Sequence, residues 1–102
     1  MLKMFEILPI DGKKSFHGKA KVMMMCNDDT DHYMVYTLYS YDTPIASYNS
    51  DNGRLTLLWN GYSATTMRHY RAFLSFCHIP AQYAAKSWWD TAERYTPHRI
   101  RW

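Results

Sequence analysis

The sequence predicts an α+β domain, an antiparallel β-meander of four to five strands with two C-terminal helices packed on one face. Apolar residues alternate with polar ones through the first 60 residues, turn sequences separate these stretches, and helical spacing begins after Ser63. The 102 residues, 47% of them hydrophobic, suffice for one core. We therefore expect a single domain over residues 1–102, mainly β over 1–60, helical over 61–96 and ending in a basic tail over 97–102.

The expected strands occupy the N-terminal part of the chain. The first, Leu2–Leu8, alternates loosely and ends at a turn containing Pro9 and Gly12. The others are expected at residues 19–25, 32–41, 45–49 and 54–59. Asn52–Gly53 lies between the last two and predicts that they pair as an antiparallel hairpin. The aspartates of residues 27–31 resemble a calcium loop, but the loop lacks the closing Gly and Glu, so no metal site is expected there.

The stretch Trp59–Tyr70 marks the change from sheet to helix. Asn60–Gly61 predicts that the chain reverses or changes direction sharply, because Gly adopts a positive φ without steric cost and Asn tolerates one. Ser63 is expected to cap a helix by accepting a hydrogen bond from the N–H of Thr65 or Thr66. Apolar residues then recur at helical spacing as far as Cys77, at positions 67, 70, 74 and 77. A second helix is expected over residues 81–95, and the tail after Pro97 either adds an edge strand or lies over the core.

Charge is uneven along the chain. Residues 1–51 carry five Lys against seven Asp or Glu, whereas residues 52–102 carry seven Lys or Arg against Asp90 and Glu93. Cys26 and Cys77 lie in apolar surroundings and are interpreted as free, buried thiols. Neither a signal-peptide-like run nor a stretch long enough to cross a membrane is found, so we expect a cytoplasmic protein that does not associate with membranes.

The residue patterns of known catalytic sites are missing from the sequence. The five histidines are scattered, without the spacing of a metal site, and no glycine-rich phosphate loop is present. Cys77 and His78 are neighbours at a helix end, where adjacent side chains point in different directions, so they are not expected to form a thiolate–imidazole pair. The sequence predicts that the protein is not an enzyme and needs neither a cofactor nor a metal.

Three strings of residues carry a family resemblance: Lys14–Val22, Leu38–Ala46 and Trp59–His69, with Phe73 after them. Across roughly residues 13–90 the chain resembles a small uncharacterised domain family of phages, plasmids and other mobile elements of gram-positive and gut bacteria. The basic tail and the methionines at 23–25 depart from that pattern. The family has no assigned chemistry, so no catalytic residue carries over. The resemblance implies an accessory protein that binds a host or rival protein complex.

Two functions therefore remain open. Protein binding fits the seventeen aromatic rings, which are more than so small a domain is expected to bury, and the resemblance narrows it to an inhibitor of a bacterial defence system, such as an anti-CRISPR protein. The alternative is a nucleic-acid-binding module. The candidate contact residues are Arg68, His69 and Arg71, expected on the outer helix face, and Arg99, Arg101 and Trp102 in the tail. A homodimer through an exposed sheet face also stays open.

Overall fold

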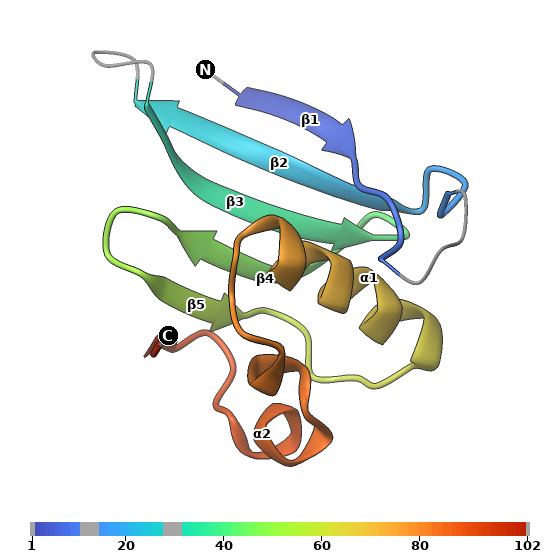
Figure 1. The fold of residues 1–102 in the computed structure, drawn as a ribbon, viewed down its shortest axis with the longest axis vertical. Helices are drawn as coiled ribbons and strands as arrows, with labels where there is room; N and C mark the ends of the chain where they lie inside the picture. The colour runs from blue at the N-terminus through green and yellow to red at the C-terminus, as the bar shows by residue number, and fades with distance from the viewer. Residues whose placement is uncertain (1, 11–14, 28–31, 102) are drawn as a thin grey trace.

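The protein is a six-stranded antiparallel meander crossed by one long helix, in a computed structural model that describes residues 2–10, 15–27 and 32–101 (Figure 1). The strands follow one another in the sheet in chain order. They are β1 (Leu2–Glu6), β2 (Ala20–Asn27), β3 (His32–Ser40), β4 (Thr43–Asn49), β5 (Arg54–Leu57) and β6 (Pro97–Arg99). The predicted α+β meander is confirmed, but the expected number of strands was too low. The aspartate-rich stretch after residue 27 lies mostly outside the described residues.

The hairpin predicted from Asn52–Gly53 is present between β4 and β5. Asn49 pairs with Arg54 next to the turn, and Ala46 pairs with Leu57 at the far end. Gly53 has a φ of 68°, a conformation that glycine adopts without steric cost. The turn sequence therefore fixes the register of this pair, as expected.

The sixth strand comes from the C-terminal tail. Residues Pro97–Arg99 pair antiparallel with β5, and the next residue, Ile100, is buried in the core. The Ile100 N–H donates to the carbonyl of Gly53 at 3.0 Å, which extends the pairing beyond the strand. The two outcomes left open for the tail are thus both realised, because it adds an edge strand and also covers part of the core.

Helix α1 (Ala64–Phe76) crosses one face of the sheet (Figure 1). Its N-cap is Ser63, whose hydroxyl accepts a hydrogen bond from the N–H of Thr66 at 3.0 Å, as predicted. The predicted apolar face is buried, and it includes Met67, Tyr70 and Leu74. The helix ends with Cys77 as its C-cap.

A second helix is present, as predicted, but it is much shorter than the expected range of residues 81–95. A 3₁₀ turn, η1 (Ala81–Ala84), precedes a short helix, α2 (Lys86–Thr91), and Ala85 between them is extended, with ψ at 138°. Arg94 explains the early end of α2, because its guanidinium donates to the carbonyls of Trp89 and Ala92 at 3.0 and 2.6 Å. The same group donates to the Trp59 carbonyl at 2.6 Å, so Arg94 fastens α2 to the segment that follows β5.

Gly61 has a different role from the predicted chain reversal, since neither Asn60 nor Gly61 adopts a positive φ. A Cβ atom on Gly61 would lie 2.3 Å from the indole ring of Trp59. The Gly61 carbonyl also accepts a hydrogen bond from the indole N–H of Trp89 at 3.2 Å. Gly61 therefore lets the Trp59 ring approach the backbone at the point where the sheet gives way to the helices.

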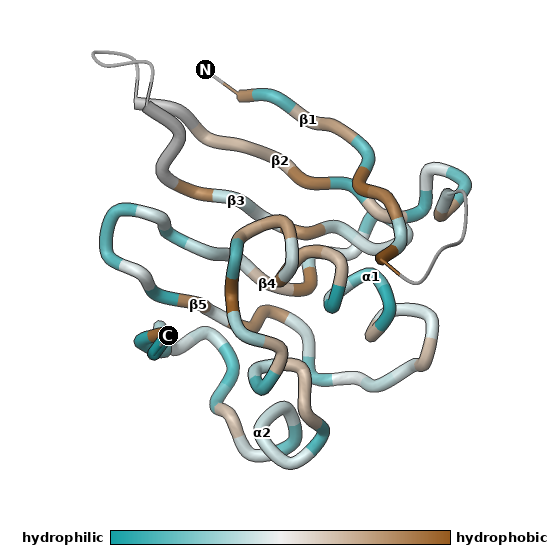
Figure 2. Tube along the Cα trace, in the orientation of Figure 1, coloured by the Kyte–Doolittle hydropathy of each residue, from teal (hydrophilic) through white to brown (hydrophobic). Residues whose placement is uncertain are grey.

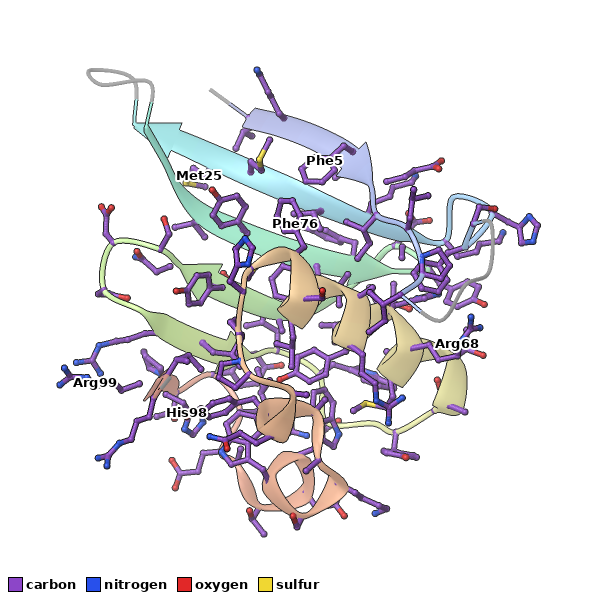
Figure 3. All side chains as sticks on the ribbon, viewed as in Figure 1. Phe5, Met25, Arg68, Phe76, His98 and Arg99 are labelled. Carbon is purple, nitrogen blue, oxygen red and sulfur yellow. The ribbon has the colours of Figure 1, made fainter. Side chains whose placement is uncertain are left out.

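The two faces of the sheet differ in burial. The face under α1 carries the core, with Val22, Leu38 and Leu55 at 0% exposure, and hydrophobic and hydrophilic segments alternate along the sheet and α1 (Figure 2). At its outer corner, Phe5 packs on Phe76 of α1 with ring centroids 5.3 Å apart (Figure 3). Within the described part of the chain, no helix is long and apolar enough to span a membrane.

Candidate binding surfaces

The structure separates two of the predicted contact residues on α1. Arg68 is half-buried, and its guanidinium lies over the ring of Phe16 at 5.4 Å. His69 is 1% exposed, so its prediction as a contact residue on the outer helix face is wrong. Its Nδ1 lies 2.7 Å from Oγ of Ser40 on β3, and burial together with the nearby charge of Arg68 lowers its pKa. The helix thus directs His69 toward the sheet.

Arg71 is exposed on the outer side of α1, as predicted. It lines a groove of about 460 Å³ between α1 and the segment that contains η1. The apolar walls of this groove include Leu74, Ile79 and Ala84, and Lys86 lies at its other side. Arg71 therefore belongs to a different surface from His69.

The predicted tail residues are exposed where the structure describes them. Arg99 and Arg101 are exposed on either side of buried Ile100, and Trp102 lies outside the described residues. Figure 3 shows Arg68 and Arg99 at opposite sides of the molecule. Arg68 and Arg99 therefore do not belong to one continuous basic surface.

A second surface, which the sequence did not single out, is the face of the sheet turned away from α1. The strand register places its side chains in two rows, and we call these residues the open face. The first row is Leu2, Met25, Val35, Asn49, Arg54 and Arg99, and the second is Met4, Met23, Thr37, Ser47, Thr56 and Pro97. None of the twelve is buried. Nothing in the described part of the chain covers this face.

The open face is apolar at one end and basic at the other. Leu2, Met4 and Met25, on the neighbouring strands β1 and β2, are 61%, 51% and 51% exposed. At the other end, Arg54 of β5 and Arg99 of β6 are directly opposite each other and both exposed. Hydroxyl side chains of β3, β4 and β5 lie between these ends. The face therefore combines an apolar patch at one end of the sheet with a pair of positive charges at the other end.

The sequence carried a partial signal for this surface. The methionine run at 23–25 stands out in the sequence. Strands β2 and β3 carry apolar residues on both faces of the sheet, however, so alternation alone does not show which face α1 covers. The same ambiguity holds for β1, where the neighbours Met4 and Phe5 are both apolar, yet of these two only Phe5 packs on the helix. The open face becomes visible once the register and the position of α1 are known.

Among the described residues, no group of three or more His, Cys, Asp or Glu side chains could hold a metal ion. Cys77 is a free thiol at the end of α1, and burial raises its pKa to about 12. A thiol in that state is protonated at neutral pH and a weak nucleophile.

The comparisons with known proteins place the chain at the level of a family. No curated protein and no solved structure matches it. The model of a family of unknown function, DUF8033, matches residues 5–91, which is most of the chain and includes β2 to β5 and α1. The protein belongs to this family of unknown function, DUF8033.

Proposed function

We propose that the protein acts by binding a partner protein through the open face. The observation that carries the proposal is the exposure of Leu2, Met4 and Met25 on one flat surface that no described segment covers. Contiguous exposed apolar side chains on a small domain are typical of interaction sites. The helix-covered face already supplies the core, so these side chains are not needed to hold the fold together.

The composition of the apolar end suits a partner that is itself a folded protein. Met4 pairs with Met23 and Leu2 pairs with Met25 across the two strands. Methionine side chains are unbranched and polarisable, so they adapt to an irregular apolar surface. The outer side of β1 is an edge of the sheet, which would let the partner extend its contact beyond the face.

The basic end specifies the charge of the partner. Like charges directly opposite each other in a sheet are destabilising, and Arg54 faces Arg99 in this way. Neither arginine forms an ion pair with another described residue. A partner that places a carboxylate between the two guanidinium groups would remove this repulsion and form charge-assisted hydrogen bonds. The partner we propose therefore presents an apolar patch at one end of its contact surface and acidic side chains at the other.

A narrower role, as an inhibitor of a bacterial defence system encoded on a mobile element, rests on the sequence resemblance. It is compatible with the proposed binding surface and needs no chemistry from the chain. A nucleic-acid-binding role is less favoured, because two of the basic residues expected to contact the nucleic acid, Arg68 and Arg99, lie on opposite sides of the molecule in Figure 3. Arg54 and Arg99 alone would supply few phosphate contacts.

The test is capture with matched variants. We expect purified defence complexes or host lysates to yield a protein retained by the wild type and by Tyr62→Glu, which alters a 52% exposed ring that lies beside Lys86 of α2 and is not part of the open face. The Met4→Glu/Met25→Glu variant should lose this protein, with affinity reduced at least about tenfold, as for central interface residues. Arg99→Glu should weaken retention as well.

Equal retention by all variants, or no protein that distinguishes wild type from Met4→Glu/Met25→Glu, would overturn the proposal. Tight binding to DNA that fades between about 50 and 200 mM salt, and that Arg99→Glu abolishes, would instead support the nucleic-acid role.

A further inference from the structure

The two edges of the sheet differ in how they are protected. At one edge, β6 has three residues, begins with Pro97 and carries Arg99. Short length, proline and positive charge all keep other strands from adding to an edge. At the other edge, β1 has five residues, no proline, an unbroken register with β2, and Lys3 balanced by Glu6 (Figure 1). Strand β1 is therefore the edge that is open to another strand.

The register fixes which backbone groups of β1 point away from the sheet. The N–H of Ile7, just after the strand, donates to the carbonyl of Ala20 on β2 at 3.2 Å, and the two residues continue the pairing of β1 with β2. Bonds to one neighbour come from every second residue of an antiparallel strand. The outward N–H and C=O groups are therefore those of Leu2, Met4 and Glu6. No other described residue forms a hydrogen bond to them.

An apolar pocket of about 320 Å³ lies beside this edge, on the side of the sheet that α1 covers. Its walls come from β1, from the residues that follow β1 and from the last turns of α1. The apolar lining residues are Phe5, Ile7, Leu8, Ile10, Ala72 and Phe76. We call this space the edge pocket. Leu8 and Ile10 are 64% and 60% exposed, so an apolar side chain in the pocket would shield them from water.

Exposed hydrophobic side chains gather on both faces of the sheet around β1. Nine large hydrophobic residues are exposed in the described chain, and six of them lie here: Leu2, Met4, Leu8, Ile10, Met25 and Phe76. Successive side chains of a strand point to opposite faces. A strand added to β1 would therefore direct its side chains alternately toward the edge pocket and toward Leu2 and Met4 of the open face. One extended segment would cover apolar groups on both sides.

We propose that the partner binds β1 with an extended segment that becomes a seventh strand of the sheet and is apolar on both sides. This inference rests on the proposed function, because it specifies how the partner of the open face is held. The outward backbone groups select a strand, since a helix satisfies its own backbone and would leave those of β1 unpaired. In this mode of recognition, main-chain hydrogen bonds give affinity and a pocket for alternate side chains gives specificity.

A second copy of the chain fits this edge less well. Two β1 strands related by a two-fold axis must pair outward residues with outward residues. Pairing about Met4 puts Lys3 of the second copy opposite Phe5, and pairing about Phe5 puts it opposite Ile7, so a charge meets the edge pocket in both cases. Pairing about Glu6 puts two carboxylates opposite each other, which is destabilising. An apolar segment of a partner avoids these conflicts.

The test uses a synthetic strand in place of the partner. The probe is a seven-residue peptide with Lys at both ends and Ile or Val between them, N-methylated at its third and fifth residues so that only one of its edges can pair. The control peptide is N-methylated at all five central residues. With the intact protein, we expect saturable binding of the probe and slower amide hydrogen exchange at Leu2, Met4 and Glu6. The control peptide should bind at least about tenfold more weakly.

Variants of the protein separate the backbone of the edge from its side chains. Glu6→Pro removes an outward N–H and no hydrogen bond to β2, and proline is tolerated at such positions. It should bind the probe at least about fivefold more weakly than Glu6→Ala, which keeps the N–H. Leu8→Glu places a carboxylate at the edge pocket and should also weaken binding, whereas Tyr62→Glu, outside the pocket, should not. The NMR spectrum of each variant reports whether it is folded.

Four outcomes would overturn this inference. These are no saturable binding of the probe up to about 5 mM, equal affinity for the probe and the control peptide, equal affinity of Glu6→Pro and Glu6→Ala, or slowed exchange at Met4 and Glu6 when the free protein is concentrated. The last would mean that a second copy occupies the edge. A captured protein that Met4→Glu/Met25→Glu loses but Glu6→Pro retains in full would support the proposed function and contradict the added strand.

Discussion

The imidazole of His69 on α1 and the hydroxyl of Ser40 at the end of β3 are joined by a 2.7 Å hydrogen bond in the buried layer between helix and sheet. This contact fastens the first half of α1 to the middle of the meander, and Thr66 is added to it through Ser40. Because a buried polar pair is costly to break on one side only, the contact helps to fix the position of the helix.

The stability of the protein should fall in mild acid because of His69. Its pKa is lowered from 6.5, first by burial and then by the charge of Arg68, so the folded state binds the proton less readily than the unfolded chain does. The contribution is therefore fully present above pH 6.5 and is lost as the pH falls through the lower, folded pKa. Urea unfolding between about pH 5 and 8 measures this dependence.

The matched variant for this prediction is His69→Asn, which keeps a polar group near Ser40 but does not titrate. We expect it to be less stable than wild type at pH 8 and to show a flatter pH profile, with Arg68, Phe16 and Tyr41 still around the site. An unchanged slope in His69→Asn would show that other groups cause the acid sensitivity.

Gly61→Ala should destabilise the fold. The added Cβ would lie 2.3 Å from the Trp59 ring, so the ring or the backbone must move, at a cost of roughly 1–3 kcal/mol typical of overpacking. Thermal unfolding compared with Asn60→Ala, a change at the exposed neighbouring residue, isolates this effect. Equal stability of the two variants would mean that the Trp59 ring is free to leave its position.

Tyr70→Phe should cost about 1–3 kcal/mol of unfolding free energy. The Tyr70 hydroxyl is buried and donates to the carbonyl of Tyr83 at 2.8 Å, and the change leaves that carbonyl without its donor. Tyr95→Phe is the control, because the Tyr95 ring is exposed. Denaturant unfolding of the pair measures the difference, and a Tyr70→Phe variant as stable as the control would contradict it.

Cys77 should react slowly with an aromatic disulfide reagent while the protein is folded. Burial raises its pKa to about 12, so almost none of the thiol is ionised at neutral pH. In a Cys26→Ser background, which leaves one thiol, we expect the rate to rise to that of an ordinary cysteine on unfolding in urea. A native rate as fast as the unfolded rate would refute the buried environment.

Elements with strong local signals could be predicted from the sequence. The hairpin at Asn52–Gly53 and the Ser63 cap depend on conformations that these residues favour by themselves, and both are confirmed. The length of the second helix was overestimated, because its end depends on hydrogen bonds from Arg94 to the distant Trp59 and to the end of α2.

The binding surfaces were harder to predict than the fold. The sequence predicts His69 on the outer helix face, because nothing local indicates its hydrogen bond to Ser40, which lies 29 positions away along the chain. The open face likewise becomes visible only with the register of six strands. Only Arg71, Arg99 and Arg101 were correctly expected to be exposed, because a charged side chain is usually solvated.

Exposure of the methionine methyl groups tests the central claim, that the open face is uncovered in the free protein and available to a partner. With ¹³C-labelled methionine methyls and a soluble paramagnetic probe, we expect strong broadening at Met4 and Met25, and none at Met67, which is 1% exposed. Adding the captured partner should then protect Met4 and Met25. If both methyls are as protected as Met67 in the free protein at every dilution, the open face is already covered and the account is contradicted.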